Sequence, residues 1–175
     1  MGTGIDLGAH IRDIEDFPKP GIRFKDITPL LADPGALAGA VAGLSEPFAG
    51  QGITKVVGME ARGFIFAAPV AVALGAGFVP VRKAGKLPWT VIRQEYQLEY
   101  GTDLLEIHED AVTPEDRVLI VDDVLATGGT AAATVELVGQ SGAAVAALAF
   151  VIELAFLGGR GPLGDVPVTS LVRYD

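Results

Sequence analysis

The strongest candidates for ligand binding or catalysis in this chain are two adjacent acids and the threonine- and glycine-rich turn that follows them. In RVLIVDDVLATGGT, residues 117–130, an apolar run leads to Asp122 and Asp123, and then to Ala126, Thr127, Gly128, Gly129 and Thr130. The apolar run is typical of a parallel strand buried on both faces, and ligands bind just beyond the carboxyl ends of such strands. A helix starting near Gly128 would offer backbone N–H groups to an anion, whereas carboxylates only accept hydrogen bonds. The pattern predicts a ligand with hydroxyls and phosphate, such as ribose 5-phosphate; the alternative is a capped turn with two solvated acids.

Two further groups indicate a polyanionic ligand. Glu60, Ala61 and Arg62 lie in GMEARGF, where a strand is expected to end and a helix to begin. Arg82, Lys83 and Lys86 cluster at the end of another expected strand. In a chain with a net charge of −9, such clustering favours a ligand with several negative charges, although exposed surface charges would also explain it.

The motifs resemble those of the type I phosphoribosyltransferases. Residues 122–130 resemble the family's phosphoribosyl-pyrophosphate signature, and ATGGT resembles its adenine-specific branch. The similarity extends, in order, through PKPGIRFKDITPLL, GMEARGF, VRKAGKLP, EYQLEYGTDLLEIH and FVIEL, and so covers nearly the whole chain.

The resemblance implies a role for each motif. Asp122 and Asp123 would be catalytic beside the ribose, and residues 126–130 would bind its 5-phosphate. Residues 60–62, with a cis peptide at Glu60–Ala61, would bind pyrophosphate together with Arg82, Lys83 and Lys86. Arg23, Phe24 and Lys25 would bind adenine, with the Phe24 ring stacked on the base. Glu99 would be a third catalytic residue, on a flexible lid over residues 86–101.

The implied reaction transfers phosphoribosyl from 5-phosphoribosyl 1-pyrophosphate to adenine, giving AMP and pyrophosphate. Mg²⁺ would be the cofactor, held mainly by substrate oxygens without a protein metal site, and the enzyme would be a homodimer. Two alternatives remain open: an enzyme for another base such as xanthine, and a regulator that only senses phosphoribosyl pyrophosphate.

Composition narrows the class of protein. At 175 residues and 50% hydrophobic, the chain is expected to form a single domain, and its acidity argues against nucleic-acid binding. The uncharged stretch 63–81 is interrupted by Gly75 and Gly77, which predicts a buried helix and strand rather than a membrane span. The amino terminus lacks the basic region of a signal peptide, so we expect a cytoplasmic protein.

The predicted fold is α/β, a doubly wound and mainly parallel sheet with a short N-terminal cap over residues 1–35 and an antiparallel flexible arm. Within the cap, residues 17–34 show little helix or strand signal. The arm is predicted from the alternating pattern of Thr102–His108. We expect parallel strands at Lys55–Met59, Phe78–Arg82, Arg117–Val121, Val145–Val151 and Pro167–Val172, and helices at Ala36–Phe48, Phe64–Leu74 and Thr130–Gln140.

Overall fold

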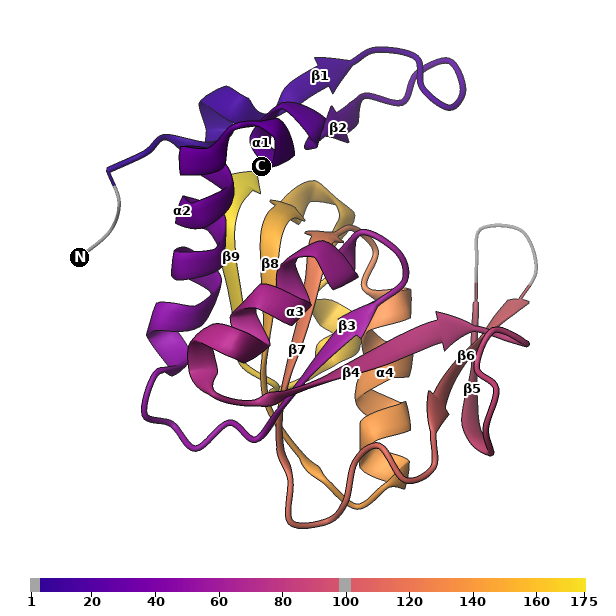
Figure 1. Ribbon diagram of the computed structural model, residues 1–175. Helices are drawn as coiled ribbons and strands as arrows, with labels where there is room; N and C mark the ends of the chain where they lie inside the picture. The colour runs from indigo at the N-terminus through magenta and orange to yellow at the C-terminus, as the bar shows by residue number, and fades with distance from the viewer. Residues whose placement is uncertain (1–3, 98–101) are drawn as a thin grey trace.

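A seven-stranded sheet with helices on both faces forms the body of the protein (Figure 1). The structure is a computed structural model, and it describes residues 4–97 and 102–175. The strand order is β5-β6-β4-β3-β7-β8-β9, and β1 and β2 form a separate hairpin. The strands are β1 (Arg12–Ile14), β2 (Phe24–Asp26), β3 (Lys55–Met59), β4 (Gly77–Lys83), β5 (Val91–Gln97), β6 (Thr102–His108), β7 (Arg117–Leu125), β8 (Ala144–Leu154) and β9 (Val168–Tyr174).

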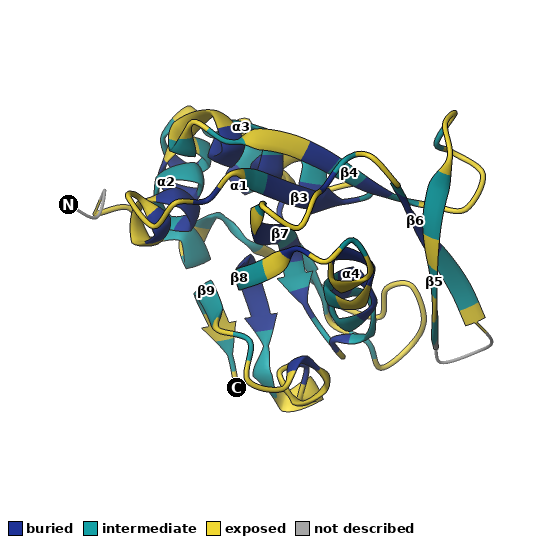
Figure 2. Cartoon of the chain, turned by 90° about the horizontal axis from the view of Figure 1, so that it is seen from below, coloured by how far each residue is buried: buried dark blue, intermediate teal, exposed yellow. Residues whose placement is uncertain are grey.

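The helices divide between the two faces of the sheet. They are α1 (Thr28–Ala32), α2 (Pro34–Ser45), α3 (Gly63–Leu74) and α4 (Gly129–Gln140), with short 3₁₀ turns η1 (Leu7–His10), η2 (Glu46–Phe48), η3 (Ala155–Leu157) and η4 (Gly161–Leu163). Figure 2 shows α1, α2 and α3 on one side of β3, β7 and β8, and α4 on the other. The expected doubly wound fold is confirmed.

Alternation along the central strands explains why both faces are covered. In β7, Leu119 and Val121 belong to the core beneath α2 and α3, whereas Val118 and Ile120 belong to the core beneath α4. Because successive strand residues point to opposite faces, a continuous apolar run supplies both cores at once. All four residues are fully buried. The β3–β4, β3–β7, β7–β8 and β8–β9 pairs are all parallel.

The arm is a two-stranded extension of the sheet edge. β5 and β6 pair antiparallel from Val91↔His108 to Gln97↔Thr102, and β6 joins β4 at Arg82↔Glu106 and Lys83↔Leu105. The expected arm at Thr102–His108 is confirmed. Within the segment predicted as a lid, residues 91–97 form strand β5, which pairs along its whole length with β6. Glu99 and the rest of residues 98–101 lie outside the described residues.

The cap contains more regular structure than the sequence predicted. β2 pairs antiparallel with β1, and α1 begins at Thr28 with Pro29 in its first turn. Asp33 then caps α2 by accepting a hydrogen bond from the Ala36 N–H at 2.7 Å. The sequence showed little helix or strand signal over residues 17–34, because elements this short lack a readable period. Among the described residues, no helix is long and apolar enough to cross a membrane.

Candidate active site

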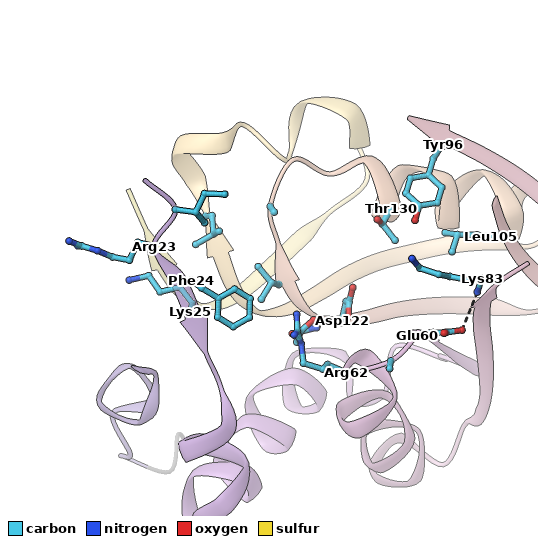
Figure 3. A pocket seen from close by; sticks show the side chains of 16 residues that line it. Arg23, Phe24, Lys25, Glu60, Arg62, Lys83, Tyr96, Leu105, Asp122 and Thr130 are labelled. Carbon is cyan, nitrogen blue, oxygen red and sulfur yellow. Dashed lines mark hydrogen bonds and ion pairs between the residues drawn. The ribbon is translucent and has the colours of Figure 1, made fainter. Parts of the chain in front are cut away.

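A cavity of about 550 Å³ runs along the carboxyl edge of the sheet, from the N-terminal hairpin to the arm (Figure 3). The hairpin contributes residues 22–25, and the loop between β3 and α3 contributes residues 60–62. The centre is lined by β7 and the start of α4, and the far end by Lys83, Tyr96 and Leu105. The motifs separated in the sequence therefore share one space.

The acid pair lies in the middle of this cavity, within β7 rather than after it. β7 pairs with β3 only as far as Val121, but it continues along β8 to Leu125. The prediction that the strand ends at Val121 was therefore wrong, because pairing with β8 extends the strand through Leu125. Asp122 and Asp123 consequently lie beyond the last β3–β7 pair, Gly58↔Val121, and both line the cavity.

The two carboxylates have different surroundings. Asp123 is buried and its carboxylate accepts a hydrogen bond from the Arg62 Nε–H. Asp122 packs against the start of α3, where a Cβ added to Gly63 would lie 2.6 Å from Asp122 Oδ1. Burial and the neighbouring Asp123 charge raise the pKa of Asp122 well above its usual range, while Arg62 acts against this shift. Asp122 therefore holds a proton more tightly than an ordinary aspartate does, whereas Asp123 is bound by Arg62.

Residues 126–130 form the turn that leads into α4, next to the acids. A second cavity of about 90 Å³ is enclosed by this turn, and it shares Asp122, Val124, Ala126 and Thr130 with the larger one. Gly128, with φ of 85°, precedes the first residue of α4, and no acidic side chain occupies the first turn of that helix. The free N–H groups and positive dipole end of α4 thus face a small polar pocket suited to one phosphate.

The predicted pyrophosphate residues are divided between the cavity and its rim. Glu60, Ala61, Arg62 and Lys83 line the cavity, and the Glu60–Ala61 peptide is cis, as the family resemblance implied. Arg82 Nε lies 3.1 Å from Glu60 Oε2, and Lys86 binds the other oxygen of the same carboxylate. Burial acts to raise the pKa of Glu60, but Lys86, the Lys83 N–H and Arg82 together lower it.

Lys83 reaches the cavity from the opposite side of its strand. Its Nζ lies 3.0 Å from Asp103 Oδ2, which also accepts a hydrogen bond from the Tyr96 hydroxyl at 3.3 Å. Since Arg82 and Lys83 are neighbours in β4, their side chains point to opposite faces, and only Lys83 is aimed inward. Arg82 and Lys86 instead bind Glu60 and do not line the cavity.

Phe24 forms one wall at the hairpin end of the cavity. Its ring meets Phe17 edge-on at 5.2 Å, and the Arg62 guanidinium lies 5.7 Å from the ring centre. The side chains of the two neighbouring residues turn away from the cavity (Figure 3). Arg23 pairs with Glu15 at 3.1 Å, and Lys25 Nζ lies 2.5 Å from Asp13 and 3.7 Å from the centre of the Tyr174 ring. Phe24 thus offers a flat apolar face, while Arg23 and Lys25 can contribute backbone groups.

Sequence reasoning did not identify five residues that line the cavity, namely Ile22, Tyr96, Leu105, Val124 and Leu154. A signal for Leu105 existed, because the alternation in Thr102–His108 places it on the same face as Asp103. Tyr96 lies in a strand that was predicted as part of a lid. Leu154 is the last residue of β8, and only the sheet order shows that this strand end adjoins the end of β7.

The comparisons with known proteins agree with this geometry. A family described as a phosphoribosyl transferase domain matches residues 28–161. An adenine phosphoribosyltransferase of Acidothermus cellulolyticus is 59% identical over 95% of this chain and 94% of its own length. One from Thermobifida fusca is also 59% identical, over 98% of both chains.

Solved structures give the same result. The adenine phosphoribosyltransferase of Rhodothermus marinus superposes with a TM-score of 0.91 at 56% identity, covering 96% of each chain. The enzyme from Saccharomyces cerevisiae, solved with adenine and an imino-altritol bisphosphate, has a TM-score of 0.90 at 44% identity, over 94% of this chain and 96% of its own. With the fold, the site and full-length relatives in agreement, this chain belongs to the phosphoribosyltransferase family, among the adenine phosphoribosyltransferases.

Proposed function

We propose that this protein transfers phosphoribosyl from 5-phosphoribosyl 1-pyrophosphate to N9 of adenine, releasing AMP and pyrophosphate. The observation that carries the proposal is the order of groups within one cavity. Phe24 forms the wall at the hairpin end, and the acid pair lies in the middle with the phosphate turn beside it. Arg62 lies between Phe24 and the acids, and Lys83 lies toward the arm (Figure 3). This order matches a base, a ribose, its 5-phosphate and its pyrophosphate.

The chemistry follows from the positions of these groups. The bond between the anomeric carbon and the pyrophosphate oxygen breaks, its electron pair leaves with pyrophosphate, and the N9 lone pair forms the new bond with inversion. Asp122 and Asp123 accept hydrogen bonds from the ribose hydroxyls and stabilise positive charge that develops on the ring. Arg62 and Lys83 stabilise the negative charge of the leaving group. The proposed acceptor for the N9 proton is Glu99.

Magnesium fits this site as a companion of the substrate. Asp123 is already bound by Arg62, and within the described ranges no three His, Asp or Glu side chains gather in a way that could hold a metal ion. We therefore propose that Mg²⁺ is held mainly by phosphoribosyl-pyrophosphate oxygens and water. When bound there, it neutralises charge on the departing pyrophosphate.

The direct test is an assay with each base singly. Purified protein with magnesium and phosphoribosyl pyrophosphate should release pyrophosphate and form a nucleotide with adenine, and much less with xanthine, hypoxanthine or guanine. Higher turnover with xanthine would reassign the base. Binding of phosphoribosyl pyrophosphate without turnover of any base would favour a regulator that senses it.

We expect the reaction in the cytoplasm, because its charged substrate does not cross membranes unaided.

Phe24→Ala should raise the KM for adenine by roughly 5- to 100-fold, because stacking on an aromatic ring is worth about 1–3 kcal/mol per base. The KM for phosphoribosyl pyrophosphate should change little. Initial rates measured with each substrate varied in turn provide the test. Phe156→Ala is the matched control, since Phe156 is an exposed aromatic residue that does not line the cavity. Equal increases for both substrates would indicate a collapsed hairpin instead of lost stacking.

We further propose that the protein is a homodimer that uses the outer face of α3. This helix has no charged or polar side chain from Gly63 to Leu74, yet Ile65 is 41% exposed and Val72 is 82% exposed. A helix that is hydrophobic all round is normally buried, so a second copy is the expected cover.

Val72→Glu should therefore shift the protein from dimer to monomer in light scattering coupled to size-exclusion chromatography. An exposed position on the opposite face of the sheet, Glu136 in α4, gives the control variant Glu136→Gln. A wild-type protein that runs as a monomer at all concentrations would refute the dimer.

A further inference from the structure

A buried carboxylate outside the cavity joins two arginines and a serine from two other parts of the chain. Glu153, near the end of β8, is 3% exposed. It accepts two hydrogen bonds of 2.7 Å from Arg160, one of 2.6 Å from the Ser170 hydroxyl and one of 3.5 Å from Arg173. The fork geometry of the Arg160 contact is the strongest form of this ion pair. The reaction proposed above uses none of these residues.

The residue before Arg160 touches the ribose-phosphate turn. A Cβ added to Gly159 would lie 2.2 Å from the Ala126 carbonyl oxygen, and one added to Gly128 would lie 2.1 Å from the Gly159 carbonyl oxygen. The two backbones are therefore packed together with no room for a side chain on either. Any movement of Gly159 must be transmitted to the turn that offers its N–H groups to the phosphate.

The segment that carries Gly159 is held at two points. Arg160 is tied to Glu153, and Leu163, in η4, is buried in the core beneath α4. The first two residues of the segment after η3 are glycines, Gly158 and Gly159, and Gly158 has φ of 68°. Because the two glycines before Arg160 restrict the backbone little, the Arg160–Glu153 ion pair is what mainly fixes the position of this segment.

The charge on Glu153 persists over the working range of pH. Hydrogen bonds from Arg160 lower the pKa of Glu153, and burial opposes this shift. The Ser170 hydrogen bond and the charges of Arg160 and Arg173 lower the pKa further, to about 2. The carboxylate thus stays ionised from neutral pH down to strongly acidic conditions, and the pair with Arg160 stays charged.

We propose that Glu153 and Arg160 are positioning residues for the ribose-phosphate turn, holding Gly159 against Ala126 and Gly128 so that the N–H groups at the start of α4 converge on the phosphate. The proposal rests on the proposed function, because it assigns the 5-phosphate of phosphoribosyl pyrophosphate to this turn. Neither residue lines the cavity, so the effect passes through the backbone of Gly159.

The test compares the two arginines that share Glu153. Arg160→Ala frees the segment beside the turn, whereas Arg173→Ala removes a longer contact to the same carboxylate from β9 and leaves the segment tied. Arg160→Ala should raise the KM for phosphoribosyl pyrophosphate roughly tenfold or more, since small misplacements of binding groups have effects of this size. It should leave the KM for adenine within roughly twofold of wild type, as should Arg173→Ala for both substrates. Arg160→Lys, which retains one charged donor, should fall between wild type and Arg160→Ala.

A second measurement needs no catalysis. Hydrogen exchange of the backbone N–H groups of residues 127–130 should be faster in Arg160→Ala than in wild type, and unchanged in Arg173→Ala. Unchanged exchange and an unchanged KM for phosphoribosyl pyrophosphate in a folded Arg160→Ala would overturn the proposal. Equal losses in Arg160→Ala and Arg173→Ala, tracking thermal stability, would also overturn it, because a purely structural ion cluster predicts that result. If the wild type were inactive, the proposed function would fail while the exchange comparison would still decide the positioning role.

Discussion

Asp123→Asn is expected to lower turnover by roughly 100-fold or more while the protein stays folded, a loss of the size seen when one preorganised stabilising group is removed. The substitution removes a buried negative charge beside the ribose position and weakens the bond that holds Arg62. Both changes act on the transition state, because positive charge develops on the ring as negative charge develops on pyrophosphate. Turnover should therefore fall more than the affinity for either substrate.

The measurement is steady-state kinetics with circular dichroism to verify folding. Asp116→Asn is the matched control, because it also removes a carboxylate that accepts a hydrogen bond from a distant part of the chain. Asp116 lies one residue before β7 begins, and its carboxylate accepts a hydrogen bond from the Thr54 hydroxyl at 2.7 Å. That position is at the other end of the strand from the cavity, so the control should turn over at nearly the wild-type rate. Wild-type turnover in Asp123→Asn would remove this residue from the catalytic groups.

Gly128→Ala should cause a second large loss, in both stability and phosphoribosyl-pyrophosphate binding. Gly128 has φ of 85°, and an added Cβ would lie 2.1 Å from the Gly159 carbonyl oxygen. The strained backbone and the clash with main-chain atoms that cannot rotate away should together lower the free energy of unfolding by on the order of 2–3 kcal/mol. Because relief of the clash moves the turn itself, the KM for phosphoribosyl pyrophosphate should also rise by roughly tenfold or more.

Gly139→Ala offers the control within the same helix. Gly139 lies near the end of α4, and an added Cβ would have nothing within 4 Å. Alanine there should be neutral or stabilise the protein by up to about 1 kcal/mol. Urea unfolding gives the stabilities, and initial rates give the KM values. If Gly128→Ala behaved like Gly139→Ala in both assays, the close packing of residues 126–128 against Gly159 could not be what shapes the phosphate turn.

The sequence by itself determined the elements that carry the site. The run 117–121 is apolar at every position after Arg117, and only a strand covered on both faces can bury such a run, so the doubly wound sheet was predictable. The change from that run to acids and then to TGGT predicted both the start of α4 and an anion site there, because glycine and threonine offer close backbone approach and hydroxyl donors. The alternation in 102–108 likewise revealed the arm.

The tertiary structure alone decided how those elements meet. Phe24 and Arg62 are far apart in sequence, and their approach depends on how the hairpin folds over the carboxyl edge of the sheet. Local composition grouped Arg82, Lys83 and Lys86, but strand alternation and the position of Glu60 separate them, so that Lys83 lines the cavity while the other two bind Glu60. The contact of Gly159 with Gly128 has no local signature either, because a glycine needed for close approach reads in sequence like one needed for a turn. Local patterns determine what an element is, whereas contacts between distant segments depend on sheet order and register, which no local pattern contains.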